Sequence, residues 1–317
     1  MTRPPRRPER VTSNDDASPS APGEGDEQPF RGVWTLGARL LTLLAMSEQR
    51  PLIILGCGYT GAEAARQALA AGRRVVGTTR SPERASELSR VGVEARVVER
   101  LEDEVAHLVP EGADVLVTFP PDGRTDVAIA KALGRARAIA YISSTGVYGD
   151  ASGHIDEDTP VDGRDAKAAA RLGAEEAYRA AGGIVLRAAA IYGPGRGLHV
   201  RLAKGEHKVA GGGRNVVSRI HVEDLARLAL AALEKAEAGS TFVVADDAPV
   251  PQAEVIGWLC ARMGVEAPKE VPREALPPTL QHDRAVDGRR IQRALGVGLR
   301  YPTYREGFGA CLDGGEI

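Results

Sequence analysis

Three glycines with the spacing G-x-G-x-x-G are the residues whose types and spacing most directly indicate chemistry in this sequence. They are Gly56, Gly58 and Gly61. In such a loop the first glycine makes a tight turn, the second lets backbone approach a pyrophosphate, and the third lets a helix pack closely on the preceding strand. The N–H groups and dipole at the helix start stabilise phosphate charge. The segment therefore predicts a dinucleotide site, and the alternative is a glycine turn without a ligand. The intervening residues expected at this site are Cys57, Tyr59 and Thr60.

The end of the second predicted strand bears on which dinucleotide binds. An acidic residue about twenty positions after the glycines commonly binds the ribose hydroxyls of NAD. Here the strand ends in Thr79-Arg80, without an acidic residue. The guanidinium of Arg80 suits a 2′-phosphate, so the sequence favours NADP over NAD, with a solvated loop arginine as the alternative. Thr118 and Phe119, at the end of the fourth predicted strand, are expected to line the same cleft.

Strands and helices alternate around these residues and must position them. Short apolar runs bounded by turn residues predict buried parallel strands. The predicted strands are 52–55, 75–79, 97–98, 115–118, 139–143 and 184–187. The predicted helices are 60–71, one starting at Pro82 after the capping residue Ser81, 125–134 and 165–181. This alternation predicts an α/β fold, a Rossmann-type doubly wound parallel sheet with helices on both faces.

The pattern changes after residue 190, where glycine-rich loops, helices at 222–236 and 251–263 and a strand at 241–245 follow. We expect a disordered or non-native extension over 1–49, an NAD(P)-binding Rossmann domain over 50–190, and a smaller substrate-binding region over 191–317 that partly interleaves with it. For the extension, the alternatives are a secretory signal, a mobile segment that docks a short helix, and a start at Met46.

Composition and charge exclude several classes of function. The net charge of −2 lacks the basic field of a nucleic-acid binder, and no apolar run reaches the roughly 18 residues that span a membrane. The three cysteines are far apart, and the six histidines lack metal-binding spacing. We therefore expect a cytoplasmic protein with a small-molecule substrate and no metal.

Four further segments resemble a known family. They are Tyr-Ile-Ser-Ser-Thr-Gly-Val-Tyr-Gly at 141–149, Ile-Tyr-Gly-Pro-Gly at 191–195, Ile-His-Val-Glu-Asp-Leu at 220–225, and Tyr301-Pro302 with Arg305-Glu306-Gly307. In this order they resemble the extended short-chain dehydrogenases/reductases, the NAD-dependent epimerase/dehydratase family, over about residues 51–312. The resemblance implies hydride transfer on a carbonyl compound or a sugar nucleotide. It also implies a homodimer formed through helices like 125–134 and 165–181.

The residues that carry proton chemistry depart from the family pattern. Family members place Tyr-x-x-x-Lys on one helix face, where the ammonium lowers the phenol pKa. Here Arg171 stands at the lysine position and Lys167 at the tyrosine position, and the glycine loop is the shorter form found in atypical members. Ser144 matches the serine that bonds the reacting oxygen, so Lys167 or Tyr148 would supply the proton. For Lys167 and Arg171 the alternative is an exposed helix face, for Ser144 a strand-end serine that bonds the backbone, and for Tyr148 a packing role.

The missing tyrosine leaves a second function open, a non-catalytic dinucleotide-binding redox sensor or scaffold. The helix start could lower the thiol pKa of Cys57 and permit such sensing, although a small loop side chain explains it equally. Arg187 could anchor a substrate anion or form a buried ion pair, and Asp224 is expected at a helix start. The candidates for binding a substrate phosphate or carboxylate in the C-terminal half are Arg196, Arg214, Arg219 and His221.

Overall fold

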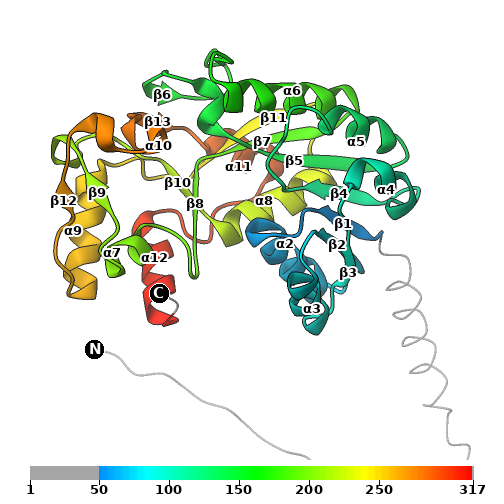
Figure 1. The fold of residues 1–317 in the computed structure, drawn as a ribbon, viewed down its shortest axis with the longest axis horizontal. Helices are drawn as coiled ribbons and strands as arrows, with labels where there is room; N and C mark the ends of the chain where they lie inside the picture. Colours follow the sequence, from blue (N-terminus) through cyan, green and yellow to red (C-terminus); the bar gives the residue numbers. More distant parts are fainter. Residues whose placement is uncertain (1–49, 316–317) are drawn as a thin grey trace, which may run out of the picture. The chain divides into compact units, whose positions relative to one another are not determined.

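Seven parallel strands form the central sheet of the computed structural model, which describes residues 50–315 (Figure 1). The predictions for residues 1–49 lie outside this part of the chain. The order of the strands is β11-β7-β5-β4-β1-β2-β3, so the chain starts in the middle and winds outward in both directions. This is the predicted Rossmann-type fold. The strands are β1 Leu52–Leu55, β2 Val75–Thr79, β3 Glu94–Val97, β4 Asp114–Val117, β5 Ala138–Ser144, β7 Ile184–Ala188 and β11 Thr241–Val244.

Helices cover both faces of the sheet, and every residue of strands such as β1 and β4 is buried, as is typical of parallel strands enclosed on both sides. One apolar core lies under α2 (Tyr59–Ala70), α3 (Pro82–Arg90), α8 (Val222–Lys235) and α11 (Arg289–Leu295). The other lies under α4 (Leu101–Leu108), α5 (Asp126–Ala132) and α6 (Ala166–Ala180). The sheet is thus held rigidly between two helical layers, with its carboxyl edge free to carry a site.

Apart from β11, α8 and α11, most residues after β7 build a second, smaller assembly beside the sheet, on the left in Figure 1, and β6 joins it from earlier in the chain. Short parallel pairs join segments far apart in sequence: β8 (Ala190–Tyr192) with β10 (Arg219–His221), β9 (Lys208–Val209) with β12 (Lys269–Glu270), and β6 (Gly153–Ile155) with β13 (Arg284–Val286). A separate apolar core is formed by α7 (Leu198–Ala203), α9 (Gln252–Met263) and α12 (Tyr304–Asp313). The remaining turns of helix are η1 Thr145–Tyr148, η2 Gly211–Gly213, η3 Arg273–Ala275 and α10 Pro278–Gln281.

Local signals fixed most element boundaries. Ser81 caps α3 by accepting a hydrogen bond from the Arg84 backbone N–H at 3.1 Å, with Pro82 as the first helical residue, as predicted. The third strand differs from the prediction at 97–98, because β3 starts at Glu94. It is an edge strand, half-buried or exposed throughout, so its apolar pattern is weak. No helix within residues 50–315 has the length and apolar character needed to cross a membrane.

Candidate functional site

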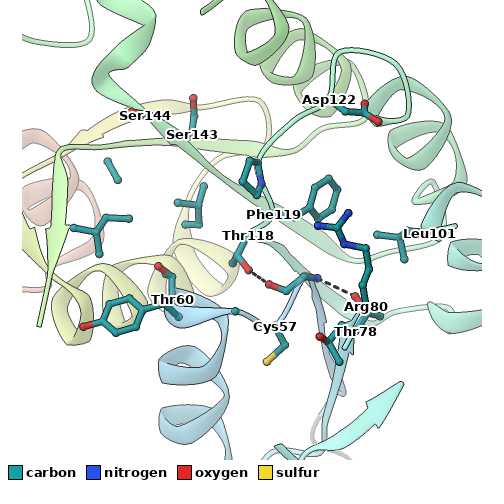
Figure 2. Close-up of a pocket in the computed structure, with 18 of the residues that line it drawn as sticks. Cys57, Thr60, Thr78, Arg80, Leu101, Thr118, Phe119, Asp122, Ser143 and Ser144 are labelled. Carbon is teal, nitrogen blue, oxygen red and sulfur yellow. Dashed lines mark hydrogen bonds between the residues drawn. The ribbon is translucent and has the colours of Figure 1, made fainter. Parts of the chain in front are cut away.

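A cleft of about 820 Å³ opens at the carboxyl edge of the sheet (Figure 2). It lies where the chain order reverses, because β1 pairs with β2 on one side and β4 on the other. Ligands of open α/β sheets bind at this reversal point. All predicted cofactor residues except Gly61 line the cleft: Gly56, Cys57, Gly58, Tyr59, Thr60, Thr79, Arg80, Thr118 and Phe119.

The loop after β1 is held in one conformation by its neighbours. Gly56 has a positive φ of 80°, and a Cβ atom there would lie 2.7 Å from the Cβ of Phe119. Its N–H donates to Thr78 Oγ1 at 2.8 Å, and its carbonyl accepts from Thr118 Oγ1 at 2.6 Å. Two threonines from neighbouring strands therefore fix the tight turn, and only glycine fits it.

The other two glycines have different surroundings. A Cβ on Gly61 would lie 2.9 Å from Ile54 Cγ2 and 2.9 Å from Thr118 Oγ1, so α2 packs closely on the sheet. A Cβ on Gly58 would meet only the Gly56 carbonyl oxygen, at 3.8 Å. Gly58 is also the N-cap of α2, without a side-chain cap and without an acidic residue in the first turn. The N–H groups at this helix start are thus open to an anion in the cleft.

Cys57 does not behave as a reactive thiol. Its side chain is 1% exposed, and burial raises the pKa of the thiol to about 11, against a smaller lowering by the charge of Arg84. The prediction that the helix start lowers this pKa is wrong, because loss of hydration outweighs the dipole. The thiol stays protonated at neutral pH, which is unfavourable for redox sensing.

Cationic side chains gather where β2 ends. Arg80 is exposed and lines the cleft, and within residues 50–315 its guanidinium makes no ion pair or hydrogen bond. Arg84, in the first turn of α3, also lines the cleft and pairs with Glu87 at 2.7 Å. Sequence reasoning missed Arg84, although its place in the first turn of the helix that follows Arg80 was a usable signal. The same end of the cleft carries the carboxylates of Glu99 and Glu102.

Two adjacent serines at the end of β5 have different surroundings. The buried Ser143 hydroxyl donates to Glu175 Oε1 at 2.5 Å. Ser144 lines the cleft, and its Oγ accepts a hydrogen bond from the Gly146 N–H at 3.1 Å while capping η1. Arg171 lines the cleft too. Since it precedes Glu175 by one turn of α6, it lies beside the end of β5. Ser144 and Arg171 therefore face the same cavity.

The other two predicted catalytic residues, Lys167 and Tyr148, do not line the cleft. Lys167 is exposed on the first turn of α6, and its backbone N–H donates to the capping Asp165 carboxylate at 2.9 Å. Tyr148 is 1% exposed. Its hydroxyl donates to the Asp156 carbonyl at 2.8 Å and accepts from Arg187 at 3.1 Å. Both side chains are absent from the lining of the cleft, so neither stands where a proton donor would be needed.

Arg187 lies in a buried ion pair, which was one of its two predicted roles. Its Nη2 is 2.8 Å from Glu175 Oε2, and the Glu175 side chain is completely buried. The four candidates of the C-terminal half differ in position. Arg219 lines a second cavity, and Arg196 lines both that cavity and the cleft. Arg214 is exposed and lines neither, whereas His221 is buried and caps α8.

Asp224 stands at the start of α8, as predicted, and also fixes a distant segment. Its carboxylate accepts hydrogen bonds from the backbone N–H groups of Arg300 at 2.7 Å and Tyr301 at 2.8 Å. A further link joins the glycine loop to the loop after β8. The Tyr59 hydroxyl donates to the Pro194 carbonyl at 3.0 Å, and the Arg196 guanidinium lies 5.1 Å from the Tyr59 ring centre. The two halves of the chain therefore meet at the cleft.

Comparison with known proteins matches residues 52–245 to the family described as the NAD dependent epimerase/dehydratase family. A curated Streptomyces sp protein named "3-diazoavenalumate denitrifying reductase" is 30% identical over 205 residues, which are 58% of this chain and 67% of that protein.

Solved structures share the fold. A functionally unknown conserved protein from Silicibacter pomeroyi DSS is 30% identical, with a TM-score of 0.73 over 85% of this chain and all (100%) of that one. DesIV, a dTDP-glucose 4,6-dehydratase from Streptomyces venezuelae with NAD and TYD bound, is 19% identical, with a TM-score of 0.70 over 83% of this chain and 96% of that one. At that identity the second likeness shows the fold alone.

Proposed function

The chain belongs to the NAD dependent epimerase/dehydratase family, and on that premise we propose that it is an NADPH-dependent reductase of a small carbonyl compound. The family makes it an enzyme of the oxidoreductase and epimerase type. The finer proposal adds the phosphorylated cofactor, the direction of the reaction and the residues that act on the substrate. The single observation that carries it is the arginine pair at the end of β2, in a cleft that also holds Ser144 and Arg171.

The residues of the cleft fit a dinucleotide. The open space at Gly58 leaves room for a pyrophosphate, and the uncapped start of α2 supplies N–H donors for it. The cavity of about 820 Å³ lies within the range of small-molecule and cofactor sites. When bound, the nicotinamide supplies the hydride that the carbonyl carbon receives.

Arg80 supports NADPH over NADH. Its guanidinium stands at the strand end where an acidic residue would bind the ribose hydroxyls of NAD, and it has no counter-ion within residues 50–315. Arg84 adds a second positive charge at the same end. A 2′-phosphate would accept charge-assisted hydrogen bonds from Arg80.

Ser144 and Arg171 account for activation of the substrate. The Ser144 oxygen already accepts from the Gly146 N–H, so its proton is available for the substrate carbonyl oxygen. The Arg171 cation stabilises the negative charge that grows on that oxygen as hydride arrives at carbon. A guanidinium does not give up its proton near neutral pH, so water in the open cleft supplies the proton that completes the alcohol. Neither side chain gains or loses a proton over the whole step, so the hydride and the proton of the new alcohol come from the nicotinamide and from water.

A fluorescence titration of the full chain with NADPH and with NADH tests this proposal. In Arg80→Ala we expect NADPH affinity to fall roughly tenfold to a hundredfold, the value of a charge-assisted hydrogen bond, while NADH affinity changes less than about threefold. The matched control is Arg90→Ala, because Arg90 is exposed at the far end of α3. Equal losses for the two nucleotides would remove the case for a 2′-phosphate contact. Binding of neither by the wild-type chain would reject the cofactor assignment.

A further inference from the structure

A second cavity, of about 510 Å³, lies next to the cofactor cleft. It is built by β8, the loop that follows it, α7, the start of β10, and parts of α9, α10 and α12. Ala190, Ile191 and Arg196 line both spaces. A molecule held in this cavity would therefore sit beside the cleft in which the reduction is proposed.

Positive charge dominates the cavity wall. Its cationic side chains are Arg196, Arg201, Lys204 and Arg219, against the single carboxylate of Glu206. Arg196, Arg201 and Lys204 are exposed, so water screens their charges strongly. Arg219 is different, because its side chain is only 4% exposed. Its charge is the one that acts in a low-dielectric environment.

The Arg219 guanidinium has no hydrogen-bond or ion-pair partner within residues 50–315, and its Nη1 is among the buried unpaired atoms. Burial lowers its pKa, an effect opposed by the charge of Asp246. Asp246 is itself buried, which raises the pKa of its carboxyl to about 7, so Asp246 is an incomplete counter-charge at neutral pH. A buried cation without a partner is strongly unfavourable unless an anion joins it.

The rest of the wall is apolar. Ile191, Leu198, Val217 and Phe308 contribute side chains to it, and Phe308 belongs to the small C-terminal core. Ligand sites commonly combine such walls with a few polar groups that fix orientation. The cavity thus offers one buried cation and an apolar enclosure.

We propose that this cavity binds the substrate of the reductase through a carboxylate or phosphate group paired with Arg219, while an apolar body fills the remaining space. The inference rests on the proposed function for the reaction, but the anion site itself does not require it. Arg219 is then a specificity-determining residue. It selects anionic substrates and holds them beside the cleft.

Calorimetric titration of the full chain, with and without saturating NADPH, tests the site with 3-phenylpropanoate, phenyl phosphate and the neutral 3-phenylpropanamide. We expect at least one anion to bind at least about tenfold more tightly than the amide. The tighter of the two anions identifies the group that the site selects. In Arg219→Met that preference should disappear, and in Arg219→Lys it should be partly retained.

Arg214→Met is the matched control, because Arg214 is an exposed arginine outside the cavity, and its affinities should stay within about twofold of wild type. Thermal unfolding separates binding from structure. Arg219→Met should unfold at an equal or higher temperature than wild type, because an unpaired buried charge is removed. The bound anion should raise the midpoint of wild type but not of the variant.

The inference is overturned if wild type does not distinguish 3-phenylpropanoate and phenyl phosphate from the amide, or if Arg219→Met keeps the preference. It is also overturned if both Arg219→Met and Arg219→Lys destabilise the protein strongly, because Arg219 would then be a structural residue. NADPH binding measured in the same samples keeps the two proposals apart. Anion binding without NADPH binding rejects only the proposed function, and the reverse result rejects only this inference.

Discussion

Two regions of this protein are each built around a buried arginine, and they treat its charge in opposite ways. Behind the carboxyl end of β5 and β7, Arg187 is 6% exposed and lies 2.8 Å from the fully buried Glu175. Ser143 and Tyr148 complete the hydrogen bonds of that pair. In the C-terminal half, Arg219 is 4% exposed and has no such partner within residues 50–315.

This difference indicates a structural role for Arg187 and a ligand-binding role for Arg219. The charge of Arg187 is neutralised inside the protein by Glu175, so no ligand is needed to balance it. The pair instead holds α6 in position against the sheet. Arg219 lines a cavity, and Asp246 compensates its charge only in part, so we propose that an anion entering the cavity completes the compensation. The following predictions test that contrast, from the largest expected change in stability to the smallest.

Breaking the Arg187 pair should have the largest effect. In Glu175→Gln, Arg187 is left as an uncompensated buried charge, and we expect the free energy of unfolding to fall by about 3–5 kcal/mol. Urea denaturation measures this change. Glu176→Gln is the matched control, because Glu176 is exposed on the same helix. A loss no larger than that of the control would end the distinction between the two arginine regions.

Asp246 tests whether the Arg219 region already contains its own counter-ion. Burial raises the pKa of this carboxyl from 3.8 to about 7. Between these pH values the folded state keeps a proton that the unfolded state has lost, so stability falls as pH rises, and the penalty is complete above about pH 7. Asp246→Asn should therefore be more stable than wild type above pH 7, by roughly 2–4 kcal/mol, with the difference vanishing below about pH 4.

Urea denaturation across pH 4 to 8 measures this difference, with Asp247→Asn, at the exposed neighbouring position, as the control. If Asp246→Asn is instead less stable than wild type at pH 8, Asp246 is an ionised partner of Arg219. The contrast between the two regions would then be lost.

Substitutions of Ser143 and Ser144 should give the smallest changes in stability. The two serines are adjacent in sequence, but Ser143 bonds the buried Glu175 carboxylate, whereas Ser144 lines the cleft. Ser143→Ala removes one hydrogen bond from the Glu175 carboxylate, which Arg187 still neutralises. We expect the free energy of unfolding to fall by about 1–2 kcal/mol and NADPH turnover to be nearly unchanged. Ser144→Ala should do the reverse, lowering turnover more than stability. Equal turnover in the two variants would remove Ser144 from the proposed chemistry.

Much of the nucleotide half could be predicted from the sequence, because its signals are local. Four apolar residues at 52–55 followed by three spaced glycines define a strand, a turn and a helix start without help from distant residues. Capping by Ser81 is equally local. The edge strand β3 was misplaced and α4 was not predicted. The half-buried or exposed residues of β3 and the single fully buried residue of α4 give weak patterns.

The catalytic assignments could be predicted only in part. The helix spacing selected Arg171, and the family motif at the end of β5 selected Ser144. Both residues line the cleft. The same reasoning selected Lys167 and Tyr148, which lie elsewhere. Helix spacing fixes which residues share a face, but it does not say which of them reaches the cavity and which reaches water.

The sequence by itself therefore determined the fold and the place of the dinucleotide loop, because short-range backbone preferences and apolar periodicity are enough to specify them. The tertiary structure alone decided the state of each charged or titratable group. Cys57 is protonated because of burial, Arg187 is paired because α6 brings Glu175 to it, and Arg219 is unpaired beside a cavity. Hydration and the distance to a counter-charge set these properties, and both depend on residues far apart in the chain.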